Sequence, residues 1–497
     1  MAATQAFIET AFQSGAGNAA KFESFESRSL RYDMYWSYYT GHQYDATRSW
    51  FAGKRVQKGL YRYVRNIYNP VERLGDFWTQ AIWRGQLDPD AGDKGAIPVK
   101  IGDKADDETL RPLIAQVNAW SNWSVNMVIH VLHGSILGDA VIYVRDDPAR
   151  QQTRLEVLHP GELIHATVDD MGFVKFYVIE YSRIDNDGKA AIYREECRRG
   201  EGEQVVFTTF RGKTPYAWAG NPGETWALEW GFIPLVLTQH KNVGLDYGYC
   251  EFHAQVGKID EANDEASLLN DQLRKSINAK WWVNGKKPSS TITVPTQTPS
   301  SDNPQPEREN EPMIYSGDAE TTIVPMVAPV DIPGALANLD KMLEEIENDL
   351  PELKAESWDG GAGPSDETIA QARGRVEDKV KLRRPGYDSG YVRAAQMAIT
   401  IAAMSGYEGF NTYNRESYKS GALDFSVSPR PVFPPQPGQV IEAEQVFWTG
   451  WKELESIGSE VPFEAYALSM GRSQEWIDGY IEMRDKKKMT RKTEAVL

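Results

Sequence analysis

One narrow stripe of apolar residues marks a helix in the second half of the chain. The breaker Ile332-Pro333-Gly334 precedes it, and the stripe itself consists of Leu336, Leu339, Leu343, Ile346, Leu350 and Leu353. A spacing of three and four places these side chains on one face of a helix. The opposite face carries Ala337, Lys341, Glu344, Glu345, Asn348 and Glu352. We expect a helix that packs on one side and presents mostly carboxylates on the other, a pattern that an ordinary surface helix also has.

A partner for this helix is predicted upstream. Its apolar residues also recur at helical spacing, at Val256, Ile259, Ala262, Ala266, Leu269, Leu273 and Ile277. The intervening residues 279–332 are rich in Pro, Ser and Thr, and they contain β-favouring pieces at 290–294 and 320–324. The order of helix, small β module and helix predicts a stalk of two rods with a knob at its tip.

A glycine-rich loop follows the stalk. Gly360, Gly361 and Gly363 permit positive φ angles, and Pro364 prevents a helix from running through this segment. The loop lacks the lysine and the flanking apolar strand of a nucleotide-binding loop, so we give phosphate binding little weight. Ser365 is a suitable N-cap for the next helix.

That next helix is long and carries a basic run. It is predicted to extend to Arg384, to kink or break at Arg384-Pro385-Gly386, and to resume over residues 391–404. Its basic residues are Arg373, Arg375, Lys379, Lys381, Arg383 and Arg384. Because Glu377 and Asp378 are interleaved with them, we favour ion pairs between subunits over phosphate contacts.

The flanking regions indicate an α+β, helix-rich fold. Helices are predicted over residues 31–41, 68–83 and 110–137, and a period of two then predicts strands such as 173–179 and 204–208. Turns are predicted at Asp170-Met171-Gly172 and Asn186-Asp187-Gly188. Towards the C-terminus, the predicted elements are a β segment at 424–427, a Pro-rich connector at 429–438, and helices at 442–457, 462–470 and 473–483.

Several sequence motifs resemble parts of enzyme or metal sites, but each lacks a residue that such a site requires. Gly212-Lys213-Thr214 ends like a phosphate-binding loop, but Phe207 stands where the first glycine is needed. His130 and His133 lack the third ligand of a metal site, and His159 and His165 flank a predicted turn, so we interpret all four as core or surface residues. Cys197 and Cys250 are too few for a disulfide framework, and we expect ordinary buried or half-buried thiols.

The order of these elements resembles the portal protein of tailed bacteriophages. The residues that carry the resemblance are Tyr68-Asn69-Pro70-Val71-Glu72-Arg73, the run 138–144, the run Gly231-Phe232-Ile233-Pro234-Leu235-Val236, and Ile259-Asp260-Glu261-Ala262-Asn263 with Ser267 and Leu268. The likeness spans residues 28–480 and depends on the order of these motifs, because none of them is specific alone.

The resemblance implies a division of the chain and a ring of twelve copies. The implied parts are a flexible N-terminal arm at 1–27, a wing at 28–249, a first stem helix at 250–278, a clip at 279–332, a second stem helix at 333–356, a tunnel loop at 357–364, a long kinked helix at 365–405, a second wing segment at 406–438, a crown at 439–485 and a basic tail at 486–497. No catalytic residue, metal or cofactor is implied.

Site residues follow from the same resemblance. The DNA-facing loop would be Trp358, Asp359, Gly360, Gly361, Ala362, Gly363 and Pro364, and channel-lining candidates are Lys341, Glu344, Glu345, Asn348 and Glu352. Clip candidates are Trp281, Trp282, Lys286 and Lys287, and the crown tail is Lys486, Lys487 and Lys488. A solvated tail is the alternative for the last three.

The implied partners are neighbouring copies, double-stranded DNA, the terminase large subunit, the major capsid protein, a scaffold protein and a head-tail adaptor. The net charge of −17 argues against binding DNA through a basic face, but it suits a lumen that repels phosphates. Solubility explains the same charge equally well. We expect a virion protein assembled in the host cytoplasm, without a signal peptide or membrane span. The alternatives are another virion protein, such as an adaptor or minor head protein, and a terminase-type enzyme.

Overall fold

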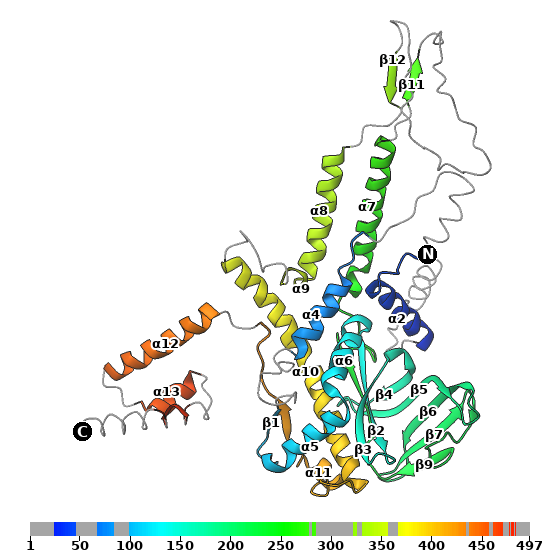
Figure 1. Cartoon of the computed structure of the whole chain (residues 1–497), viewed down its shortest axis with the longest axis vertical. Helices are drawn as coiled ribbons and strands as arrows, with labels where there is room; N and C mark the ends of the chain where they lie inside the picture. The colour runs from blue at the N-terminus through cyan, green and yellow to red at the C-terminus, as the bar shows by residue number, and fades with distance from the viewer. Residues whose placement is uncertain are drawn as a thin grey trace, which may run out of the picture. The chain divides into compact units, whose positions relative to one another are not determined.

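Helices and antiparallel strands occupy separate stretches of the chain, which confirms the α+β class (Figure 1). The computed structural model describes residues 24–45, 67–83, 99–277, 281–284, 322–325, 331–355, 366–433, 437–456, 461–470, 477, 479–481 and 483. By its internal contacts the chain divides into two units, Met1–Arg430 and Pro431–Leu497. The first unit contains every sheet and the candidate site.

The larger sheet of the first unit is antiparallel and has the order β4-β5-β6-β7-β8, with β9 paired to β7. Its strands are β4 (Leu163–Val168), β5 (Val174–Ile184), β6 (Ala190–Arg199), β7 (Val205–Arg211), β8 (Thr214–Pro215) and β9 (Thr225–Leu228). Gly172 and Gly188 have φ angles of +79° and +77°, so both predicted turns use the left-handed conformation that glycine permits. The predicted strands at 173–179 and 204–208 are confirmed as parts of β5 and β7.

The smaller sheet has the order β10-β2-β3 and lies between the larger sheet and two helices. Its strands are β2 (Asp139–Asp147), β3 (Gln152–Leu158) and β10 (Leu235–Gln239). Residues 139–144 are all buried, because α6 and α10 pack against this sheet and Tyr143 contacts Tyr177 of β5 at a ring separation of 6.1 Å. Between the sheets, the buried Glu195 carboxylate accepts hydrogen bonds from Tyr143 at 3.1 Å, Tyr177 at 2.6 Å and Tyr193.

The N-terminal helices differ from the prediction at one break and at their starts, since the helices predicted to begin at residues 31 and 68 begin at Phe25 and Val71. They are α2 (Phe25–Tyr39), α4 (Val71–Trp83), α5 (Asp107–Trp120) and α6 (Trp123–Leu137). The single helix predicted over 110–137 is wrong, because Asn122 adopts a left-handed φ of +46° and separates α5 from α6. Ser121 fixes this break, since its hydroxyl accepts a hydrogen bond from Leu155 N of β3 at 2.9 Å.

The central helix of the first unit, α10 (Asp366–Met404), runs without interruption through Pro385. The helix therefore does not break at this proline, and a kink there stays a prediction. Proline in a helix costs about 3 kcal/mol, but contacts on both sides hold the helix in place. Arg384 Nη2 donates to Ala81 O at 2.7 Å, and the backbone of Gly390 lies so close to β10 that an added Cβ would be 2.5 Å from Thr238 Oγ1.

Two helices form the predicted stalk, α7 (Val256–Ile277) and α8 (Ile332–Asp349). Pro333 and Gly334 belong to the first turn of α8 rather than to a breaker, since Asp331 caps Gly334 N at 3.1 Å and proline is tolerated there. The continuous helix predicted to residue 356 is also wrong. The chain turns at Pro351 and continues as the short α9 (Glu352–Ala355).

The remaining elements of the first unit are short. They are β1 (Val99–Ile101), η1 (Pro160–Glu162), η2 (His253–Gln255), β11 (Trp281–Asn284), β12 (Thr322–Pro325), α11 (Arg415–Ser420) and β13 (Phe425–Val427). The β segment predicted at 424–427 is confirmed as β13, which pairs with β1. The piece predicted at 320–324 is confirmed in part by β12, which pairs antiparallel with β11.

The second unit is helical among its described residues. It contains α12 (Pro437–Ser456) and α13 (Phe463–Ser469), which confirm two of the three predicted helices. Aromatic rings of Phe447, Trp451 and Tyr466 form its core, and Tyr466 donates to Phe447 O at 2.9 Å. Most of the helix predicted at 473–483 lies outside the described residues.

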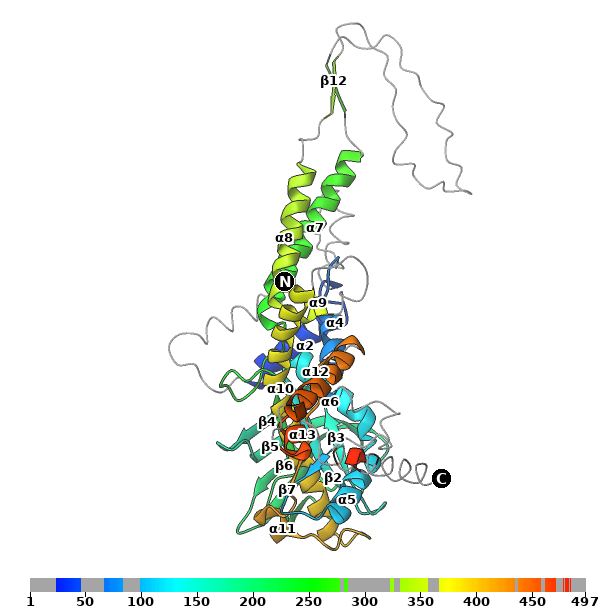
Figure 2. The same cartoon turned by 90° about the vertical axis from the view of Figure 1, so that its left-hand side faces the viewer.

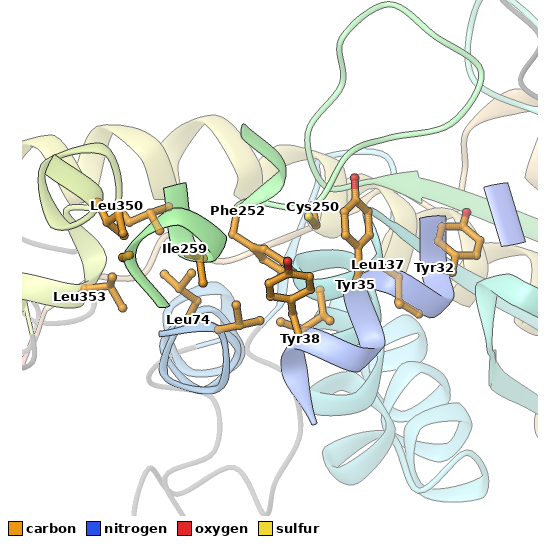
Figure 3. Close-up of a cluster of buried hydrophobic side chains, with 14 residues drawn as sticks. Tyr32, Tyr35, Tyr38, Leu74, Leu137, Cys250, Phe252, Ile259, Leu350 and Leu353 are labelled. Carbon is orange, nitrogen blue, oxygen red and sulfur yellow. The ribbon is translucent and has the colours of Figure 1, made fainter. Parts of the chain in front are cut away.

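A buried apolar cluster joins the stalk to the rest of the first unit (Figure 3). Tyr35 and Tyr38 come from α2, Leu74 from α4, Ile259 from α7 and Leu353 from α9. These side chains meet where α7 begins and α8 ends, so the stalk is anchored at its base.

Candidate functional site

The candidate site is the antiparallel hairpin of α7 and α8, which lie side by side in both views (Figures 1 and 2). Near its base, Lys258 Nζ of α7 contacts Asp349 Oδ2 of α8 at 2.8 Å. Farther along, Asn338 Nδ2 of α8 donates to Glu265 Oε1 of α7 at 2.8 Å. Because the start of one helix meets the end of the other, the two helices run in opposite directions.

The hairpin exposes four of the five predicted channel-lining side chains. Lys341, Glu344, Glu345 and Asn348 are exposed on α8. Glu345 lies 3.6 Å from Lys258, and Asn348 accepts a hydrogen bond from Lys354 at 2.7 Å. Exposed pairs of this kind contribute little to stability. The four side chains are two glutamates, one lysine and one asparagine.

The predicted exposure of Glu352, the fifth candidate, is wrong. The helix ends at Asp349 and Pro351 turns the chain, so Glu352 lies on α9 with only 1% of its surface exposed. Its carboxylate contacts Lys379 Nζ of α10 at 2.9 Å rather than facing a lumen.

Lys379 is the centre of a buried ion network at the base of the hairpin. The network comprises His240, Glu251, Glu352, Lys379 and Arg383. Lys379 Nζ lies 2.9 Å from Glu251 Oε1 as well as from Glu352 Oε1, so one ammonium joins α10 to α9 and to the segment that precedes α7. Arg383 Nη2 and His240 Nε2 approach the other Glu251 oxygen at 3.3 Å and 3.2 Å.

The network is balanced in charge, with two carboxylates, two cations and a histidine. Burial by itself raises the pKa of Glu251, but the hydrogen bond from His240 and the neighbouring charges hold that pKa well below its ordinary value. Burial opposes protonation of Lys379, yet Glu352 and Glu251 raise its pKa above the usual range. Burial lowers the pKa of His240. We infer that Glu251 and Lys379 carry full charges near neutral pH.

Residues of the predicted basic run have partners in and beside this network. Lys379 and Arg383 pair with carboxylates, and Arg384 donates to Ala81 O, all within one chain. Lys379 and Arg383 therefore form ion pairs, and the carboxylates that pair with them belong to the same chain. Contacts of the run with another subunit stay a prediction. Lys381 is exposed and lies 3.4 Å from Glu377 on the same helix.

Two polar residues of α7 fasten the hairpin to the N-terminal region. Asp260 accepts hydrogen bonds from the hydroxyls of Tyr38 and Tyr44, both at 2.5 Å. Asn263 Oδ1 accepts from the backbone N–H groups of Ile67 and Tyr68, each at 2.8 Å. Both residues occur in the motif 259–263, which the sequence analysis quoted as part of a helix without a role for its polar side chains.

Other predicted site residues fall largely outside the described part of the chain. Trp281 and Trp282 lie in β11. The residues that the structure does not describe are Lys286, Lys287, Trp358, Asp359, Gly360, Gly361, Ala362, Gly363, Pro364, Lys486, Lys487 and Lys488. The described chain nevertheless brackets residues 356–365, because α9 precedes them and α10 follows.

The histidines and cysteines of the described residues are mostly buried or half-buried. Among the described residues as a whole, no group of three or more His, Cys, Asp or Glu side chains is placed to hold a metal ion, and no helix has the length and hydropathy of a membrane span. Burial lowers the pKa of His130 to about 3 and that of His133 to about 4, as expected for neutral core histidines. Cys197 and Cys250 are buried free thiols, as predicted.

Comparisons with known proteins give low similarity. No protein-family model matches the sequence, and no curated protein matches it. One similar structure is a chain from the virion of a native gene transfer agent particle, with 13% identity and a TM-score of 0.37, covering 81% of this chain and 89% of that one. Another, from the neck of an empty gene transfer agent particle, has 13% identity and a TM-score of 0.38, covering 82% and 90%. Likeness at this level establishes neither family nor function.

Sequence reasoning missed two central residues of the site. Glu251 and His240 lie outside the helical stripes, and the sequence around them shows no periodic pattern. The available signal was the basic run itself, since buried cations in a packed helix require carboxylate partners. That signal does not say which carboxylates they are.

Proposed function

We propose that this chain is a portal protein of a tailed bacteriophage, which forms a ring of twelve copies at one capsid vertex. The observation that supports it best is a rigid antiparallel hairpin whose base is fixed by buried charges while Lys341, Glu344 and Glu345 stay exposed. The element order resembles that of portal proteins, as described above. In the ring, the hairpins would surround a channel for double-stranded DNA.

An anionic wall suits a channel through which DNA must slide. Carboxylates repel the phosphates and leave no cationic face to which the backbone could bind tightly. At physiological salt, charges interact over a Debye length of about 8 Å, so the repulsion acts only on phosphates close to the wall. The proposed wall therefore centres the duplex without retarding it along the axis.

The buried ion network has a mechanical role in this proposal. Residues 357–364 would form the tunnel loop that narrows the channel. Glu352 on α9 precedes that loop, and Lys379 on α10 follows it. Because Glu352 and Lys379 are in direct contact, α9 and α10, which flank residues 356–365, are joined at the hairpin base. In this proposal, displacement of the loop would strain that junction.

The proposed partners follow the resemblance. Residues 279–332, with Trp281, Trp282, Lys286 and Lys287, would bind the terminase large subunit during packaging and the head-tail adaptor afterwards. The outer parts would contact the major capsid protein and the scaffold protein. Lys486, Lys487 and Lys488 would lie near packaged DNA. In this proposal the chain has no enzymatic activity and acts as a passage and docking platform in the virion.

Imaging of the purified full-length chain by negative-stain electron microscopy tests the proposal. We expect rings with a central hole, together with binding of the terminase large subunit in a pull-down. Rings that fail to bind terminase would point to an adaptor or minor head protein. Monomers with metal-dependent DNA cleavage would instead indicate a terminase-type enzyme.

A second test addresses the loop. Replacement of Gly360, Gly361 and Gly363 by leucine should leave ring assembly intact and impair DNA packaging in an in vitro packaging assay, since bulky side chains would obstruct the channel. The matched control places leucine at Gly223, Gly374 and Gly479, where φ is not positive and an added Cβ meets no atom closer than 3.7 Å. Normal packaging by the loop variant would contradict the assigned role of residues 357–364.

A further inference from the structure

One face of the first unit combines exposed apolar side chains from α2 and α6. Trp36 and Ile129 are 37% and 39% exposed, and Val125 is 51% exposed. The rings of Trp36 and Tyr39 lie 5.2 Å apart. Tyr39 and Leu132 meet over α4, where a Cβ added at Gly75 would be 3.1 Å and 3.2 Å from them. We call this set the α2–α6 face: Trp36, Tyr39, Val125, Ile129 and Leu132.

Carboxylates surround the α2–α6 face. Beyond the effect of its partial burial, the charges of Asp76 and Glu72 raise the pKa of Tyr39, so both lie close to that ring. Burial lowers the pKa of His159, and the nearby charge of Asp33 partly opposes this shift. The ring of His159 is 6.3 Å from that of Trp36. All three carboxylates are exposed, and none is paired with a cation among the described residues. An apolar centre with an uncompensated anionic rim fits a basic segment rich in aromatic residues.

The chain itself contains a segment of that chemistry. Residues 46–66 include six basic residues and no acidic one, and they also include Trp50, Phe51, Leu60, Tyr61 and Tyr63. Its two ends are fixed on α7, since the Tyr44 hydroxyl donates to Asp260 and Ile67 N donates to Asn263. The segment therefore leaves and rejoins the described structure beside two residues of α7 that are less than one helical turn apart.

We propose that residues 46–66 of one copy bind the α2–α6 face of a neighbouring copy. The inference rests on the proposed function only because it requires a ring in which each copy has a neighbour. A closed ring joins two different surfaces of each subunit, and a basic aromatic segment and an acidic apolar face are two such surfaces. Each chain carries a net charge of −17, so assembly side by side is opposed by repulsion. Contact between opposite charges offsets part of that repulsion.

Cysteine cross-linking tests the contact in full-length chains. An Ile129→Cys chain is co-expressed with a Leu60→Cys chain, and the native cysteines are buried. After mild oxidation we expect a band of doubled mass from the mixture and none from either variant alone. The control replaces Ile129→Cys by Ile192→Cys, which is 50% exposed on the larger sheet and should give no cross-link. Absence of the band of doubled mass from the mixture would overturn the proposal. So would a cross-link that forms only within a single chain carrying both Leu60→Cys and Ile129→Cys.

Charge reversal provides an independent readout. The D33K/E72K/D76K variant should lower the fraction of protein recovered as ring at least tenfold in analytical ultracentrifugation. The matched variant D170K/E201K/E224K changes the same net charge at other exposed positions and should assemble like wild type. If wild type forms no ring, the proposed function fails. If wild type forms rings and both variants assemble equally, only the contact proposed here is refuted.

Discussion

The hairpin and the junction beneath it are adjacent, yet different forces hold them together. Along α8 only Ile346 is fully buried, and the pairs that join the two helices, such as Lys258 with Asp349, are exposed. At the junction, Glu251, Glu352 and Lys379 are buried and in direct contact. The hairpin is thus stabilised mainly by one apolar stripe, whereas the junction depends on compensated charges.

Because of this difference, the two regions tolerate the loss of a charged side chain to different degrees. Loss of an exposed pair removes little, because water and salt already screen it. Loss of one member of a buried network leaves its partners charged in a medium that solvates them poorly. Surface charges of the hairpin can therefore change with little loss of stability, while the stability of the junction requires all of its charges together.

The largest expected effect comes from Lys379→Met. This change leaves Glu251 and Glu352 buried without their shared cation, and removal of one partner of a buried pair costs about 3–5 kcal/mol. Chemical denaturation followed by circular dichroism measures the loss. Lys381→Met, at a position 63% exposed on the same helix, is the control and should stay within about 0.5 kcal/mol of wild type. Equal stability of both variants would abolish the distinction between the regions.

Ile346→Ala is expected to be nearly as damaging, because Ile346 is 0% exposed and lies in the apolar cluster. Truncation of such a residue costs about 2–4 kcal/mol through lost burial and a residual cavity. Leu336→Ala, on the same stripe but 45% exposed, should cost much less. Comparison of the two denaturation midpoints checks whether stabilisation of the stripe is concentrated at its base.

The pH dependence of stability should report the junction. The folded pKa of Glu251 lies below its unfolded value, so the unfolded chain binds more protons as the pH falls below about 4.5. Stability contributed by Glu251 is therefore present above that pH and is lost on acidification, by at most about 1.4 kcal/mol per pH unit. Glu251→Gln should flatten this slope between pH 5 and 3. An unchanged slope would show that Glu251 is not charged in the folded state.

The smallest effect is expected from Lys258→Ala. Its partners Asp349 and Glu345 are exposed, so the free energy of unfolding should not change measurably at physiological salt. Thermal melts at low and high salt check this. A marked, salt-insensitive destabilisation would mean that the hairpin, like the junction, depends on a specific ion pair.

Prediction from sequence succeeded where a pattern repeats and failed where single contacts decide. The stripe of α8 and the spacing in α7 predicted two helices, and Gly172 and Gly188 marked turns correctly. The sequence predicts a kink or a break at Pro385 from the local penalty of proline. No break occurs, because contacts of Arg384 and Gly390 that the sequence does not reveal hold α10 together. For Glu352, the local pattern gave a wrong prediction. Its helical spacing placed it on the exposed face, but the turn at Pro351 directed it to Lys379.

The sequence by itself determined the two helices of the hairpin, the turns at Gly172 and Gly188 and the charged face of α8, since these depend on composition and local periodicity. Only the tertiary structure decided that α10 is continuous, that Glu352 is buried and that Lys379 joins Glu251 to Glu352. The physical reason is distance along the chain. Residues 251, 352 and 379 interact strongly because folding brings them together away from water, and no local pattern records which buried charges will meet.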